Sequence, residues 1–156
     1  MRVRRLVGGA VIALALVGAL AACGLGPLFV GPAVPSKSEF VGVWRHTGPD
    51  GKQAVIELAK NQRVSVTGLP RDVLQLGNNG LDPLKKPNWA DSVDTSGTWL
   101  IAHDSVDSSS YIELTLGPKP SSTVTKLFFD RPSSHLQLYF YLNDPDLNVT
   151  FRFQRE

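Results

Sequence analysis

The sequence has a single cysteine, Cys23, among its 156 residues. An intramolecular disulfide therefore cannot form, and a folded domain has to be stabilised by its hydrophobic core. Charged residues are also absent from one long stretch, Leu6 to Ser36, which separates a short basic N-terminus from the remaining chain. Cys23 lies inside this uncharged stretch.

Motifs of common hydrolases and redox proteins are missing as well. The chain contains no Gly-x-Ser-x-Gly, His-Glu-x-x-His or Cys-x-x-Cys. His46, His103 and His135 stand at two predicted strand ends and in a predicted turn, and nothing in the sequence joins any of them to a nucleophile and a carboxylate. We therefore expect no enzymatic activity and no cofactor.

The charged residues give no sign of a metal or a nucleic acid. Removal of Arg2, Arg4 and Arg5 with a signal peptide leaves 13 Lys+Arg against 14 Asp+Glu, a net charge of −1, without the basic face that nucleic-acid binding needs. A calcium site needs several converging oxygens. Aspartates in predicted loops are more often solvated turn residues, and we interpret four of them in this way: Asp91, Asp94, Asp104 and Asp107.

The N-terminus has the three parts of a secretory signal peptide. Arginines come first, an uncharged apolar run from Leu6 to Leu20 follows, and the small residues Ala21 and Ala22 precede Cys23. The run is shorter than the ~20 residues that span a bilayer, and glycines and prolines from residue 24 to 32 disfavour a longer helix. The arginines stay inside by the positive-inside rule, so residues 36–156 are predicted outside. Export by either the general or the twin-arginine route stays open.

The segment Leu20-Ala21-Ala22-Cys23 resembles the lipobox of bacterial lipoproteins. The resemblance implies that the Cys23 sulfur receives a diacylglyceryl group and that residues 1–22 are cleaved as the signal peptide. A thiolate suits this step as a strong nucleophile near neutral pH, and two acyl chains anchor stably where one is marginal. The expected location is the extracytoplasmic face of the cell membrane.

Residues 23–38 are predicted to be the lipidated N-terminus and a tether. Their Gly/Pro-rich sequence, GLGPLFVGPAVPSKS after the cysteine, has no helical or strand periodicity, and its prolines favour an extended, semi-rigid spacer. Residues 39–156 then form one domain, because 118 residues are enough for one hydrophobic core and not for two.

The domain is predicted to be all-β. Leu136, Leu138 and Phe140 alternate with Gln137, Tyr139 and Tyr141, which is the pattern of a half-buried antiparallel strand. Such patterns, separated by turn sequences, predict eight strands: Phe40–Arg45, Gln53–Ala59, Arg63–Gly68, Gly97–His103, Tyr111–Leu116, Thr123–Phe129, Leu136–Leu142 and Val149–Gln154. Eight is about the smallest number that closes around a filled interior or one small ligand. We expect a single antiparallel β-barrel, with a β-sandwich as the alternative.

Two segments of the sequence echo one another. Gly42-Val43-Trp44 precedes Ile56-Glu57-Leu58, and Gly97-Thr98-Trp99 precedes Ile112-Glu113-Leu114. The echo predicts two equivalent hairpins, each with a Gly-x-Trp strand and an Ile-Glu-Leu strand. We interpret Trp44 and Trp99 as structural residues of the core, because both recur at strand starts rather than in loops.

Gly-x-Trp at residues 42–44 resembles the first strand of the calycin group, which contains the lipocalins, fatty-acid-binding proteins and avidins. The resemblance implies a calycin-like barrel in which Arg152, near the last strand, packs over the Trp44 indole as a cation–π pair. A Thr-Asp-Tyr motif and a C-terminal helix, both typical of lipocalins, are absent. The outside domain also resembles small lipoproteins of high-GC Gram-positive bacteria, in its Gly68-Leu69-Pro70 and Asp144-Pro145-Asp146 segments. That resemblance implies location and fold, and no activity.

The segment Arg71–Ser96 is predicted to be a long loop over the mouth of the barrel, because hairpin loops usually have 2–5 residues. Our hypothesis is that Trp89, with Leu74 and Leu76, caps the barrel and helps to line a small-ligand pocket. The alternative is that Trp89 plugs the end of the core. We expect a binding module for a small apolar or amphipathic molecule, or else a module on which outward-facing Tyr139 and Tyr141 dock an envelope protein.

Overall fold

The computed structural model describes residues 34–75, 86–106 and 109–156, which belong to one compact unit from Val34 to Glu156. The predicted signal peptide and tether up to residue 33, with Leu20, Ala21, Ala22 and Cys23, lie outside the described residues, and so does Leu76. Among the described residues, no helix has the length and hydrophobicity of a membrane span.

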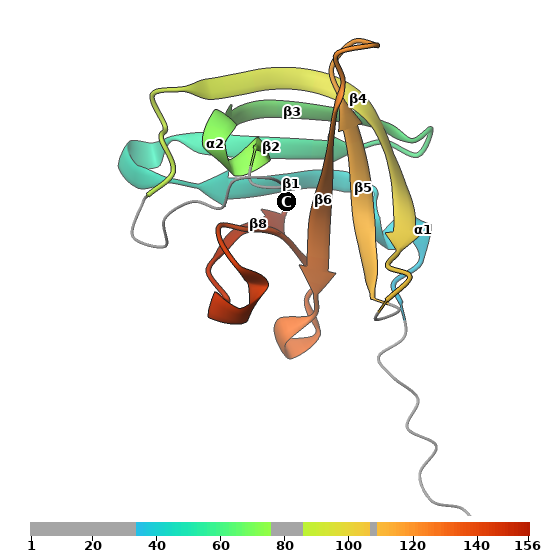
Figure 1. Ribbon diagram of the computed structural model, residues 1–156. Helices are drawn as coiled ribbons and strands as arrows, with labels where there is room; N and C mark the ends of the chain where they lie inside the picture. The colour runs from blue at the N-terminus through green and yellow to red at the C-terminus, as the bar shows by residue number, and fades with distance from the viewer. Residues whose placement is uncertain (1–33, 76–85, 107–108) are drawn as a thin grey trace, which may run out of the picture. The chain divides into compact units, whose positions relative to one another are not determined.

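Eight antiparallel strands close into a barrel in chain order, each paired with the next and β8 paired with β1 (Figure 1). The strands are β1 (Gly42–Thr47), β2 (Gln53–Leu58), β3 (Arg63–Pro70), β4 (Ser92–His103), β5 (Ser110–Leu116), β6 (Thr123–Asp130), β7 (Gln137–Tyr141) and β8 (Thr150–Arg155). The helical segments are short: α1 (Lys37–Phe40), α2 (Arg71–Leu74), η1 (Pro49–Gly51), η2 (Pro132–Ser134) and η3 (Pro145–Leu147). The predicted eight-stranded antiparallel barrel is confirmed, and the sandwich alternative is wrong.

The centre of the barrel is a packed apolar core. Along the strands, inward aliphatic and aromatic residues alternate with outward residues, as period two requires, and on β3 a register shift between Val66 and Leu69 changes the parity. The core residues are Phe40, Trp44, Ala54, Ile56, Leu58, Val64, Val66, Leu69, Val73, Leu74, Trp99, Ile112, Leu114, Leu116, Leu127, Leu138, Phe140, Phe151 and Phe153. Tyr139 and Tyr141 lie half-buried on the opposite, outer face of β7. The barrel is therefore filled along its length rather than hollow.

Each echoed Gly-x-Trp strand pairs with its Ile-Glu-Leu strand, as predicted, but the two registers differ by two residues. Trp44 pairs across the sheet with Ile56, and Trp99 pairs with Leu114. Both indoles are buried, and each indole N–H donates to a backbone carbonyl, at 2.8 Å for Trp44 to Phe40 and 3.0 Å for Trp99 to Ala59. A buried indole needs such a partner. The structure is consistent with a structural role for both tryptophans.

Gly97 in the second Gly-x-Trp permits a close approach of two strands. A Cβ at this position would lie 1.9 Å from the Thr115 carbonyl oxygen on β5. No side chain fits there, which is the usual meaning of glycine inside a strand.

Arg155, not Arg152, lies over Trp44, which corrects the prediction from the calycin resemblance. The Arg155 guanidinium carbon is 5.8 Å from the indole centroid, and Arg155 is the register partner of Trp44 across the β1–β8 seam. Arg155 shares the inward parity of Phe151 and Phe153, whereas Arg152 points outward from β8. There it lies 4.8 Å from the Tyr139 ring centroid.

Two boundaries differ from the prediction. β4 begins at Ser92, so the irregular segment after Arg71 is shorter than expected, because Val93 pairs with Leu69 and the Asp94 carboxylate accepts from the Gly68 N–H at 2.8 Å. α1 begins at Lys37, inside the predicted tether. Its first turn is closed by Glu39, whose carboxylate accepts from the Ser36 N–H at 2.8 Å.

Candidate binding cleft

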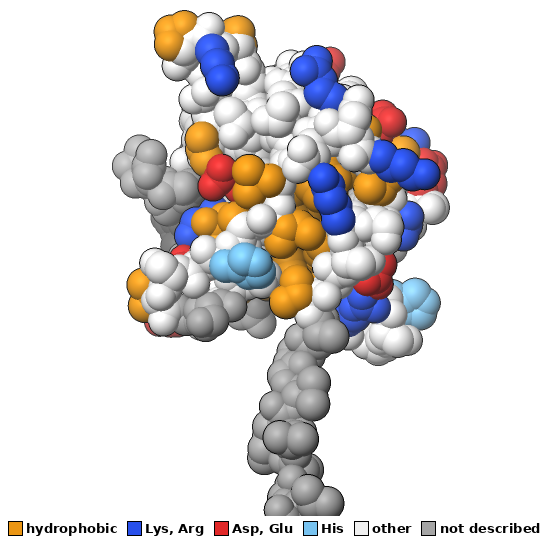
Figure 2. Space-filling model, turned by 90° about the vertical axis from the view of Figure 1, so that its right-hand side faces the viewer, with side chains coloured by type: hydrophobic (Ala, Val, Ile, Leu, Met, Phe, Trp, Pro, Cys, Tyr) orange, Lys and Arg blue, Asp and Glu red, His pale blue; other side chains and the backbone are white. Residues whose placement is uncertain are grey.

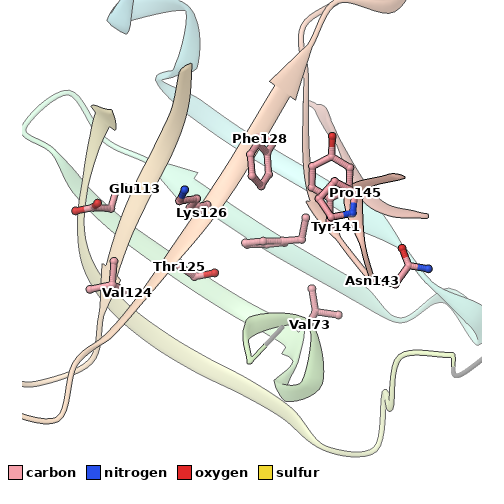
Figure 3. A pocket seen from close by; sticks show the side chains of 10 residues that line it. Val73, Glu113, Val124, Thr125, Lys126, Phe128, Tyr141, Asn143 and Pro145 are labelled. Atoms are coloured by element: carbon pink, nitrogen blue, oxygen red, sulfur yellow. The ribbon is translucent and has the colours of Figure 1, made fainter. Parts of the chain in front are cut away.

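β6 changes its strand partner halfway along its length, and this opens the wall. Thr123–Leu127 pair with β5, whereas Phe128–Asp130 pair with β7. β7 ends at Tyr141, and the chain then turns through η3 before β8. A cleft of about 450 Å³ lies beside the first half of β6, and the turn after β7 forms its opposite side (Figure 3). Small-molecule sites usually have volumes of ~300–1,000 Å³.

The floor of the cleft is apolar. Val73 from α2 and Phe140 from β7 line it, and both are almost fully buried. One side of the rim is formed by Phe128, Tyr141 and Pro145. The cleft therefore lies directly over residues of the barrel core.

The turn that carries Val73 is held in place from both sides. The Arg71 N–H donates to the Asp91 carbonyl at 2.8 Å, and the Arg71 guanidinium pairs with the Asp91 carboxylate at 3.1 Å. The Asp72 carboxylate accepts from the Asn88 N–H at 2.9 Å. These bonds fix α2 at its position against the core, where Val73 and Leu74 are buried.

Thr125 supplies a hydroxyl to the inner half of the cleft. It is 8% exposed and is the one buried polar residue in the described part of the chain. It shares the inward face of β6 with Leu127 and pairs across the sheet with Leu114. In Figure 3 its oxygen points from β6 toward the space above Val73. A single hydroxyl thus faces an otherwise apolar floor.

Charged residues lie at the outer rim only. Lys126 and Glu113 are register partners on the outer face of β6 and β5. The Lys126 ammonium bonds the Asp104 carboxylate at 3.1 Å and lies 4.5 Å from the Tyr111 ring centroid. The Val106 N–H and this ammonium hydrogen-bond Asp104 and lower the pKa of its carboxyl. The positive charge of Lys126 at the rim is therefore neutralised by the Asp104 carboxylate.

Asn143 lies across the cleft from Thr125 in Figure 3. Both polar atoms of its side-chain amide are buried and have no hydrogen-bond partner among the described residues. A buried amide without partners costs free energy. The unpaired Asn143 amide therefore lowers the stability of the turn after β7, beside the cleft.

Four aromatic residues form an outer aromatic face: Tyr111, Phe128, Tyr139 and Tyr141. Phe128 and Tyr141 have ring centroids 4.8 Å apart, and those of Tyr139 and Tyr141 are 5.2 Å apart. Burial, together with the hydrogen bond to Tyr141, raises the pKa of the Tyr139 phenol. In Figure 2, hydrophobic side chains gather near the middle of one side of the molecule, with lysine and arginine side chains among them. Tyr139 and Tyr141 point outward from β7, as the docking hypothesis requires.

Trp89 plugs one end of the barrel and is not among the residues that line the cleft. Its ring centroid lies 5.8 Å from those of His46 and Phe151, and its indole lies directly on Gly48. The same His46 ring stacks on Phe151 at 3.8 Å and donates from Nδ1 to the Arg152 carbonyl at 2.7 Å. Leu74 lines a different hollow, beside Ser92 and Leu116. Val73, its neighbour in α2, is the residue that reaches the cleft.

Gly48→Ala is expected to destabilise the barrel through Trp89. The backbone of Gly48 is extended (φ −88°), so alanine fits it without strain, but the added Cβ would lie 2.1 Å from an indole carbon. We expect a loss of about 1–3 kcal/mol in unfolding free energy from this overpacking. Urea unfolding of the single and double variants with Trp89→Ala measures the coupling. A cost of Gly48→Ala that is equal in both backgrounds would contradict the contact.

Each of the three histidines hydrogen-bonds through Nδ1 to a different partner. Nδ1 of His103 lies 2.8 Å from the Ser110 hydroxyl, and Nδ1 of His135 donates to the Ser133 carbonyl at 3.0 Å. Among the described residues, no group of three His, Cys, Asp or Glu side chains could hold a metal ion.

The comparisons with known proteins give no family. No protein-family model matches the sequence, and neither the curated proteins nor the solved structures include a significant match. The proposed ligand site therefore rests on the geometry of the cleft alone.

Proposed function

We propose that this chain is a lipid-anchored envelope protein whose barrel binds a small apolar or amphipathic molecule. The observation that carries the binding proposal is the lateral cleft, whose floor is formed by the core residues Val73 and Phe140. An apolar concavity with a few polar groups is the usual form of a small-molecule site. The packed centre of the barrel argues for this cleft over an axial cavity.

The proposed location rests on the sequence of residues 1–23. A basic start, an apolar run and Leu20-Ala21-Ala22-Cys23 support export and diacylglyceryl attachment at Cys23. Attachment would keep the barrel at the extracytoplasmic face of the cell membrane, where an apolar ligand is found at high local concentration.

Native mass spectrometry of the protein released from the envelope in a mild detergent tests the binding proposal. We expect the wild type to retain a small molecule that Val73→Phe has lost, because the larger ring fills the floor of the cleft. Leu100→Phe is the matched control, since Leu100 is 43% exposed and is not among the residues that line the cleft. Equal ligand content in the wild type and Val73→Phe, or an empty wild type, would contradict the proposal.

A second candidate function is the docking of an envelope protein, and the outer aromatic face favours it. Aromatic residues are enriched at protein interfaces, and Tyr139 and Tyr141 stand on the outside of β7. The same variants separate the two candidates. A docking module captures its partner from envelope extract equally well as wild type and as Val73→Phe, and carries no small molecule in either form.

A further inference from the structure

Thr125 is an unusual residue for its position. Leu127, two residues further on the same face of β6, and Leu114, its cross-strand partner, are fully buried aliphatic residues, so valine would fit the core at this position. Among the described residues, no hydrogen bond reaches the Thr125 side-chain oxygen, and this oxygen is not one of the fully buried unpaired atoms, so it is open to the cleft. In Figure 3 it points from β6 into the cleft. A molecule bound there can replace solvent as its hydrogen-bond partner.

The inner half of the cleft contains no charged side chain among the described residues. Its floor is Val73 and Phe140, and its polar groups are the hydroxyl of Thr125 and the uncharged amide of Asn143. Glu113 and Lys126 lie on the outer face of the wall, and Lys126 is already paired with Asp104. A charged group placed against this floor would lose its hydration without gaining an opposite charge. The part of a ligand that enters is therefore uncharged.

We propose that the cleft selects neutral, lipid-like molecules, with an apolar body against Val73 and Phe140 and one uncharged hydroxyl or carbonyl oxygen bonded to Thr125. This inference rests on the proposed function and names its ligand class. The Thr125 hydroxyl both donates and accepts, so it serves an alcohol and a carbonyl alike.

Titration of the full-length protein in detergent-free nanodiscs, followed by NMR, tests the selection with three probes of equal chain length: 1-octanol, octanoate and octylammonium. We expect 1-octanol to bind more tightly than either charged probe. Thr125→Val should weaken 1-octanol about five- to tenfold, the effect of one lost hydrogen bond. Thr125→Ser keeps the hydroxyl and should bind 1-octanol within about twofold of the wild type. A thermal melt of Thr125→Val at or above that of the wild type shows that its fold is intact.

Two results overturn the ligand class and leave the proposed function standing. One is tighter binding of octanoate or octylammonium than of 1-octanol. The other is equal affinity of Thr125→Val and the wild type for 1-octanol. A different result overturns the proposed function itself: no probe binds the wild type, and native mass spectrometry finds no retained molecule either.

Discussion

Trp44→Ala is expected to cost the barrel about 3–5 kcal/mol of unfolding free energy, the usual penalty for truncating a buried aromatic residue. Trp44 has no exposed surface, pairs with Ile56 across the first hairpin and bonds the Phe40 carbonyl. It also lies under Arg155 at the seam where β8 closes on β1. Truncation removes core volume and weakens the closure of the barrel at once. Urea unfolding followed by circular dichroism measures the loss.

Two further variants control this prediction. Trp44→Phe keeps most of the apolar volume and leaves the Phe40 carbonyl without its donor, so we expect a smaller loss of about 1–3 kcal/mol. Leu100→Ala removes an outward side chain that is 43% exposed, and its effect should stay within about 1 kcal/mol. If Trp44→Ala cost no more than Leu100→Ala, the packed barrel described above would be wrong.

Cys23→Ser is expected to abolish attachment to the membrane. A serine oxygen cannot form the thioether that the lipobox resemblance implies, and without two acyl chains the barrel has no stable anchor. Growth with an alkyne-labelled fatty acid should mark the wild type and leave the variant unmarked. The wild type should also sediment with membranes, and the variant should not.

The matched control for Cys23→Ser is Ser36→Ala, which changes a hydroxyl beyond the proposed lipidation site and should be labelled like the wild type. Label on neither the wild type nor Cys23→Ser, or equal label on both, would refute the anchor. Recovery of the uncleaved chain in the cytosol would refute export as well.

The strands could be predicted from the sequence because each strand buries one face and exposes the other. Leu136, Leu138 and Phe140 alternate with polar and tyrosine residues, and a half-buried antiparallel strand gives that pattern and few others. The eight predicted strands therefore match the barrel, with shifts at their ends. The pairing of the strands that carry Trp44 and Trp99 with the strands that follow them was also predictable, whereas their registers, which differ by two residues, were not.

The contact between Arg155 and Trp44 could not be predicted from the sequence, because it depends on which face of β8 each arginine occupies near the end of the strand. Arg152 and Arg155 both lie in β8, and a resemblance to calycins selected the first. The structure places Arg155 on the inward side and in register with Trp44. A shift of three residues reverses the face in a strand, so a motif without a register cannot decide between them.

The cleft was missed for a related reason. It exists because β6 pairs with β5 over one half and with β7 over the other, and no local pattern encodes that exchange of partners. One signal was available: Thr125 stands at an inward position of the predicted strand, two residues before the core residue Leu127. A polar residue on an apolar face is the kind of local inconsistency that accompanies a functional site.

The central claim is that the lateral cleft beside β6 is the ligand site. Chemical-shift mapping of the ¹⁵N-labelled protein with 1-octanol tests it most directly. We predict that the largest changes fall on the amides of Val73, Thr125 and Phe140, and that Val73→Phe removes them. Changes centred on Trp89 at the end of the barrel, on Tyr139 at the outer aromatic face, or on no residue at saturating 1-octanol would contradict it.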